Sequence, residues 1–95
     1  MKEISRERIE KTIREEYAEA RKFINEGFNR YCEIVINVST GDIWSNLYLD
    51  TEHYKVYEDE DIFKLQYIPG LVEDTEKAFI EDAIEKFEDA GWTIV

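Results

Sequence analysis

The sequence predicts an α+β fold, with an antiparallel sheet of three to four strands flanked by an N-terminal and a C-terminal helix. Stretches with a helical period of apolar residues lie near both ends of the chain, and segments with alternating apolar residues lie between them. A chain of 95 residues has no room for a second hydrophobic core. We therefore expect one domain over residues 1–95, with helices packed on one face of a sheet.

The first helix is expected to begin after Ser5, a good N-cap, and to end at Gly27. Its apolar residues recur every three or four positions and share one face: Ile9, Ile13, Tyr17, Ala20 and Ile24. Charges of both signs lie on the opposite face and pair at i,i+4 spacing. Because such pairs contribute little, we interpret this face as simply solvated.

Residues 31–68 are interpreted as a meander of four antiparallel strands, at 31–38, 43–49, 53–57 and 62–68. Alternation in the first strand predicts one apolar side made of Cys32, Ile34, Ile36 and Val38. Alternation in the second predicts one side made of Ile43, Leu47 and Leu49. Trp44 and Tyr48 then point the other way, together with Tyr31 and Val35 of the first strand.

The second helix is expected from about Glu73 to Ala90, with Gly91 as its stop. Its buried stripe consists of Phe79, Ile80, Ala83, Ile84 and Phe87. The last residues, 92–95, fit two alternatives, a short final strand or irregular chain docked on the domain.

No motif for catalysis, a cofactor or a metal is recognisable, so we expect a protein that is not an enzyme. Cys32 and His53 are the only residues of their kinds, and Cys32 alternates with core residues, where thiols are usually inert. A zinc site needs four soft ligands, and the four glycines lie at element ends rather than in a phosphate-binding loop. With no apolar leader or membrane span, a cytoplasmic protein is the expectation.

Charge is unevenly distributed along the chain, whose net charge is −11. Residues 1–30 carry seven Asp/Glu against eight Lys/Arg, whereas residues 31–95 carry sixteen against four. A net field of one sign attracts partners of the opposite sign and repels nucleic acid and anionic membranes. We therefore expect a basic protein surface as the partner, with no direct binding to nucleic acid or membrane.

Two acidic segments are candidates for contact with that partner. On the second helix, Glu81, Glu85 and Glu88 share one exposed stripe, with Asp82 and Asp89 beside it. Like charges at i,i+4 and anions in the last helical turn are both unfavourable, and repeated violations of local rules are typical of functional surfaces. The second segment is the loop of Glu58, Asp59, Glu60 and Asp61. The alternative is that these acids only confer solubility.

Trp44 and Tyr48 form a third candidate, of a different kind. If both helices cover one sheet face, these rings line an open face that could serve as an interface. The alternative is that one helix covers each face, or that the sheet curls over the rings. An open aromatic face would allow a homodimer or a self-associating module, in which the acid only confers solubility.

In length, order of elements and acidity, the chain resembles small phage-encoded acidic proteins that block CRISPR or restriction nucleases. The resemblance implies an anti-CRISPR or DNA-mimic inhibitor, acting in the host cytoplasm, whose carboxylates replace phosphates in a cationic nucleic-acid-binding site. The resemblance is of architecture and charge, so it assigns no residue a role. Immunity proteins and antitoxins that cap basic nucleases are similar by the same logic.

Overall fold

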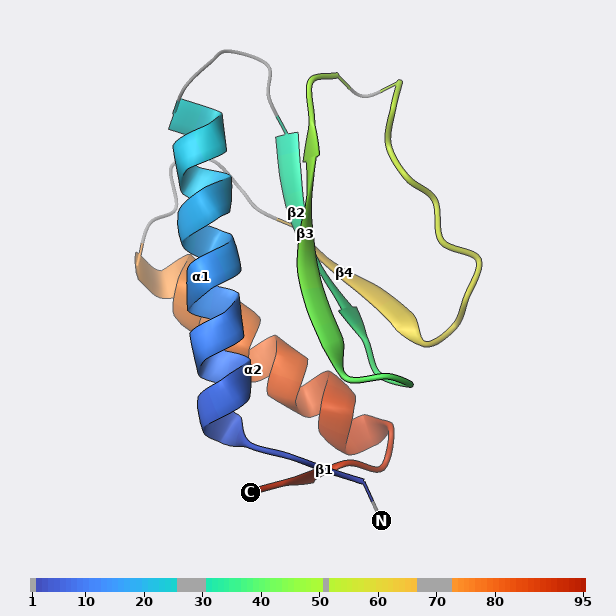
Figure 1. The fold of residues 1–95 in the computed structure, drawn as a ribbon. Helices are drawn as coiled ribbons and strands as arrows, with labels where there is room; N and C mark the ends of the chain where they lie inside the picture. The colour runs from blue at the N-terminus through green and yellow to red at the C-terminus, as the bar shows by residue number, and fades with distance from the viewer. Residues whose placement is uncertain (1, 26–30, 51, 67–72) are drawn as a thin grey trace.

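The computed structural model describes residues 2–25, 31–50, 52–66 and 73–95 (Figure 1). The elements are, in order, β1 (Glu3–Ile4), α1 (Arg6–Asn25), β2 (Tyr31–Asn37), β3 (Asp42–Tyr48), β4 (Ile62–Gln66), α2 (Glu73–Asp89) and β5 (Thr93–Ile94). The antiparallel sheet has the order β3-β2-β4, while β1 and β5 form a separate parallel pair. Both helices lie on the same face of the three-stranded sheet (Figure 1). The α+β class is confirmed.

The hydrophobic core lies between the helices and one face of the sheet. Tyr17 of α1 meets Phe79 of α2 edge to face, with ring centroids 6.0 Å apart. The core side predicted for the first strand is confirmed, because all four of its residues are buried: Cys32, Ile34, Ile36 and Val38. The helix stripes are confirmed as well wherever their side chains are described; Ile24 and Gly27 lie outside that part of the chain.

Local hydrogen bonds explain where the helices begin and end. Ser5 Oγ accepts a hydrogen bond from the amide of Arg8 at 3.0 Å, the N-cap geometry expected from the sequence. At the end of α2, the amide of Gly91 donates to Glu88 and that of Trp92 donates to Phe87, at 2.9 and 3.0 Å. This pair of bonds is a Schellman motif, and Gly91 supplies the positive φ of 94° that it requires.

The predicted four-strand meander is wrong in two respects. Residues 54–59 form no regular secondary structure, so the strand expected at 53–57 is absent, and β4 pairs with β2 rather than with a neighbour in the meander. Ile34, Val35 and Ile36 of β2 are all fully buried, and a strand apolar on both sides is best placed in the middle of a sheet. The chain must therefore cross from β3 at one edge to β4 at the other.

Residues 52–61, here called the crossing segment, make that connection on the sheet face opposite the helices (Figure 1). The edge position of β3 also corrects the predicted burial of its apolar side. Ile43 packs against the core, but Leu47 and Leu49 are 42% and 68% exposed. Pairing at an edge leaves one flank of a strand without a neighbour to cover it.

The ends of the chain pair with each other. Residues 93–94 form a strand, as one of the two alternatives predicted, but its partner is β1 and not the main sheet. The amide of Arg6 donates to Val95 O at 2.9 Å and extends this pairing into the start of α1. Among the described residues, no helix is both long and apolar enough to cross a lipid bilayer.

Candidate protein-binding surfaces

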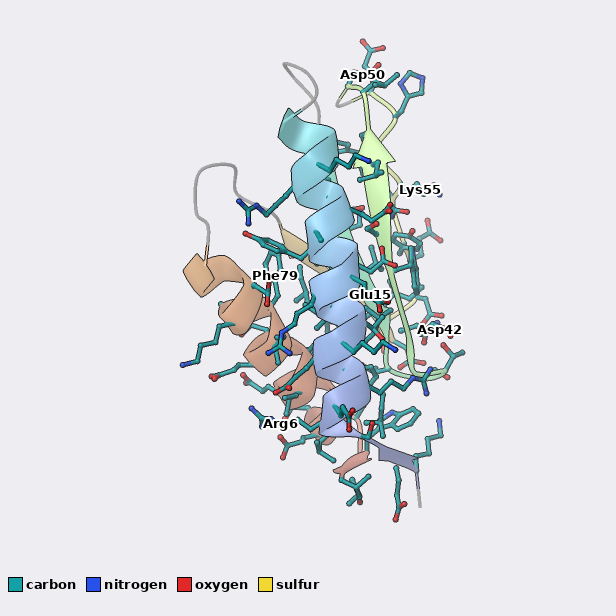
Figure 2. All side chains as sticks on the ribbon, turned by 60° about the vertical axis from the view of Figure 1, so that its left-hand side comes forward. Arg6, Glu15, Asp42, Asp50, Lys55 and Phe79 are labelled. Atoms are coloured by element: carbon teal, nitrogen blue, oxygen red, sulfur yellow. The ribbon has the colours of Figure 1, made fainter. Side chains whose placement is uncertain are left out.

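The acidic side of α2 is exposed over its last three turns. The exposed carboxylates are those of Glu81, Asp82, Glu85, Glu88 and Asp89. Four of them line an open hollow of about 380 Å³, together with Ile84 and with Arg6 from the start of α1. Figure 2 shows Arg6 on the side of α1 that is turned toward α2.

Arg6 places a positive charge beside the carboxylates of α2 and partly offsets their mutual repulsion. The sequence pattern did not reveal this contact. It lines the hollow and also contacts Glu10 at 3.1 Å, so one guanidinium lies among several carboxylates. Further along, Arg14 Nε lies 3.2 Å from Glu76 Oε1 and joins the two helices. We predicted that the charges on this face of α1 pair with one another. In the structure, Arg14 also pairs with Glu76 of α2, so the face is partly paired with the second helix. Exposed pairs of this kind contribute only about 0–1 kcal/mol each.

The acidic loop Glu58–Asp61 lies on the other side of the sheet from α2 (Figure 1). All four residues are exposed, but two of them shape the turn that leads into β4. Asp59 Oδ1 accepts the amide of Asp61 at 2.9 Å, and Asp61 O accepts the amide of Val38 at 2.8 Å. The structure thus does not bring the two acidic segments together. Nor do three or more potential metal ligands cluster anywhere in the described ranges.

The sheet face that carries Trp44 and Tyr48 is covered, which corrects the expectation of an open aromatic face. Neither a helix nor a curl of the sheet covers it; the crossing segment does. Tyr48 is only 6% exposed and stacks at a tilt on Tyr54, with centroids 4.9 Å apart. Trp44 is half-buried and meets Tyr57 edge to face at 6.2 Å. Val35, expected on the same outer side, is fully buried.

Polar side chains hold the crossing segment on the sheet. Glu33 Oε1 accepts hydrogen bonds from the Tyr48 hydroxyl at 2.7 Å and from Asn46 Nδ2 at 3.2 Å, and lies 3.3 Å from Lys64 Nζ. Asn46 also donates to the Tyr57 hydroxyl at 2.8 Å. We call Glu33, Asn46, Tyr48, Tyr57 and Lys64 the sheet-face network. No buried side-chain nitrogen or oxygen in the described residues lacks a hydrogen-bond partner.

Two backbone contacts complete the attachment of the crossing segment. The amide of Lys55 donates to the Tyr48 hydroxyl at 3.1 Å, and Lys64 Nζ donates to Lys55 O. Sequence reasoning missed the network because its members lie far apart along the chain. Strand alternation was the one sequence signal for it. Glu33 and Val35 point to the same sheet face, and Val35 lies opposite Lys64 in the β2–β4 register.

Burial raises the pKa of one member of the network, Tyr48, and of Cys32, which neighbours Glu33. Burial, reinforced by the hydrogen bond to Glu33, raises the pKa of Tyr48 to about 12. Burial and the neighbouring Glu33 charge raise the pKa of Cys32 to about 12, and its thiol donates to Ala20 O at 3.9 Å. His53 lies exposed at the turn after β3, where its Nδ1 is 2.5 Å from Asp50 Oδ1. That hydrogen bond lowers the pKa of Asp50.

Comparison with protein-family models, with curated proteins and with solved structures gave no match to this chain.

Proposed function

We propose that the chain is a binding protein, not an enzyme, whose acidic α2 side occupies a cationic nucleic-acid-binding surface on a partner enzyme. The observation that carries this proposal is the row of five exposed carboxylates along α2, from Glu81 to Asp89. Carboxylates on neighbouring turns lie about 5–6 Å apart at the Cβ level, so a groove lined with Lys or Arg can pair with several at once. The groove thus gains the charge attraction that nucleic-acid phosphates would otherwise supply, without contact to any nucleobase.

The charge of the whole chain supports the same proposal through its effect on encounter rates. A net charge of −11 draws a basic surface in and speeds association at low ionic strength. The action proposed is that of the acidic phage inhibitors of CRISPR and restriction nucleases, in the cytoplasm where such enzymes work. A nuclease toxin with a basic active-site cleft would be recognised by the same chemistry.

The α2 side is preferred over the other two candidate surfaces. In the loop Glu58–Asp61, two of the four residues support the local turn, so they are less free to reorient toward a partner. The aromatic surface is not part of the proposed contact, because Tyr48 lies under the crossing segment. Self-association through that face is not favoured for the same reason.

The test is displacement of fluorescent DNA from a panel of purified CRISPR nucleases, restriction nucleases and nuclease toxins, measured over a salt series. At least one enzyme should lose its DNA at low ionic strength. Its direct binding to the chain, followed without DNA over the same series, should weaken as salt rises toward roughly 0.5 M, where charge interactions are strongly screened. Reversing Glu81, Glu85 and Glu88 to Lys should weaken inhibition at least a hundredfold. Thermal stability should change little, because the pair at positions 85 and 89 becomes one of opposite charge while the pair at positions 81 and 85 stays one of like charge, beside Arg6.

The matched control reverses the same number of charges elsewhere, at Glu7, Glu58 and Glu60, all exposed. If this control weakens inhibition as much as the α2 variant, net charge or the acidic loop Glu58–Asp61, and not the α2 side, is responsible. If no enzyme in the panel is inhibited at low salt, the proposal is wrong.

A further inference from the structure

The outer edge of β3 is unpaired among the described residues, because β3 is the first strand in the order β3-β2-β4. An edge strand presents unpaired N–H and C=O groups, and proteins normally protect such edges with charges, proline, bulges or short strands. β3 is seven residues long, and after Asp42 at its start it contains neither a charged residue nor a proline. β4, at the opposite edge, has five residues and carries Lys64.

Two exposed apolar side chains continue this edge. Leu47 lies opposite Cys32 in the β2–β3 register and therefore points to the helix side of the sheet, yet it is 42% exposed. Leu49, just after the strand, is 68% exposed. An extended chain added beside β3 would place alternate side chains against these two leucines.

Helix α1 contributes acidic residues beside the same edge. The helix packs along β3, and Arg14 marks the side that faces α2, through its contact with Glu76. Glu19 is five residues further on, about 140° from Arg14 around the solvent side of the helix, so it lies on the flank that is turned away from α2. Figure 2 shows Glu15 on the side of α1 next to β3, while Lys55 lies on the opposite side of the strand. Glu15 and Glu19 are both exposed.

We propose that the outer edge of β3 accepts an extended, lysine- or arginine-bearing segment of a partner protein as an additional strand. Backbone hydrogen bonds to the edge supply the affinity, and Glu15 and Glu19 of α1 select basic side chains on the added strand. A second copy of this chain is a poor occupant, because each copy carries a charge of −11. The site is separate from the α2 side and does not depend on the function proposed for it.

The probe is a fluorescently labelled ten-residue peptide of alternating lysine and valine, titrated with the full chain at low salt and followed by anisotropy. The comparison peptide has the same sequence with every second amide N-methylated, which preserves charge and removes the donors needed for pairing. The methylated peptide should bind at least tenfold more weakly. Equal binding of the two peptides, or no binding of the first, overturns the proposal.

A matched pair of variants locates the site on the protein. Leu47→Lys places a charge at the β3 edge and should weaken binding at least tenfold. Val56→Lys adds the same charge at a residue of the crossing segment that is 84% exposed, and should change binding less than twofold. Equal effects of the two substitutions would show that only net charge matters, which refutes the proposal. Circular dichroism melting of both variants verifies that they fold.

A third measurement does not depend on Leu47 at all. Glu15→Gln combined with Glu19→Gln leaves the strand intact and should weaken peptide binding three- to tenfold. In hydrogen exchange of the wild-type chain, the peptide should slow exchange at alternate amides of β3 and nowhere along α2. Protection confined to α2, or a peptide-free dimer with protected β3 amides, would show that the edge does not take this occupant.

Discussion

The hydroxyl of Tyr48 makes the hydrogen bonds that most directly attach the crossing segment to the sheet. We therefore predict that Tyr48→Phe destabilises the protein. This oxygen donates to Glu33 at 2.7 Å and accepts the amide of Lys55 at 3.1 Å. The ring is only 6% exposed, and the Glu33 side chain is 12% exposed. Water can therefore replace the lost hydroxyl only in part.

The expected cost follows from these two bonds. A hydrogen bond to a charged group is worth about 1.5–3 kcal/mol, and the loss leaves a carboxylate with one donor fewer at a half-buried site. The amide of Lys55 also loses its acceptor, in a hydrogen bond that is partly buried. We expect a loss of about 2 kcal/mol in the free energy of unfolding, or a fall of roughly 8–16 °C in Tm for a domain of this size.

The assay is urea denaturation of two separate single variants, Tyr48→Phe and Tyr57→Phe, compared with wild type. Both substitutions delete one hydroxyl, but Tyr57 accepts only a neutral bond from Asn46, whose amide group still donates to Glu33. Tyr57→Phe should therefore cost about 1 kcal/mol or less. Limited trypsin digestion should cleave after Lys55 faster in Tyr48→Phe than in wild type. If the two variants are equally stable, the argument that Glu33 anchors this segment is wrong.

Three further predictions concern single residues. Gly41→Ala should cost more than Gly91→Ala in thermal melting, because both glycines have positive φ but only at Gly41 would a Cβ lie 3.1 Å from the Trp92 ring; equal losses would contradict this. The Cys32 thiol should react with iodoacetamide at pH 8 only as fast as the protein unfolds, since burial keeps it protonated, and rapid labelling of the native state would refute it. Folding raises the pKa values of Cys32 and Tyr48, so protonation of these groups contributes fully to the free energy of unfolding below about pH 9 and stops contributing as pH rises toward 12. The urea midpoint of the wild-type protein should therefore fall between these pH values. It should fall less steeply in Cys32→Ala.

The helices and the core were predictable because local rules determine them. Ser5 and Gly91 have the residue types that helix ends require, and Ile9, Ile13 and Tyr17 repeat at the helical period. Strand alternation identified the buried side of β2 for the same reason. Each of these signals is contained within a few neighbouring residues.

Strand order and the state of the aromatic face were not predictable, because they depend on contacts between distant segments. The run around His53–Tyr57 alternates like a strand, but its polar groups bond to side chains of β3 and β4 instead of to a ladder. Nothing within that run indicates Glu33 or Lys64 as its partners. The acidity of α2 was visible in the sequence, whereas the Arg6 guanidinium beside it was visible only in three dimensions.

The parallel pair of β1 and β5 has a consequence for the order in which the molecule assembles. It joins Glu3 to Thr93, so almost the entire chain must be in place before these two short strands can meet. The β2–β3 hairpin, in contrast, closes over the few residues between Asn37 and Asp42. Since closure of a long loop costs more entropy than closure of a short one, the hairpin can form early in folding and the terminal pair only late. When the native protein fluctuates, opening of the same pair would release the amide of Arg6 from Val95 O and expose the first turn of α1 to hydrogen exchange.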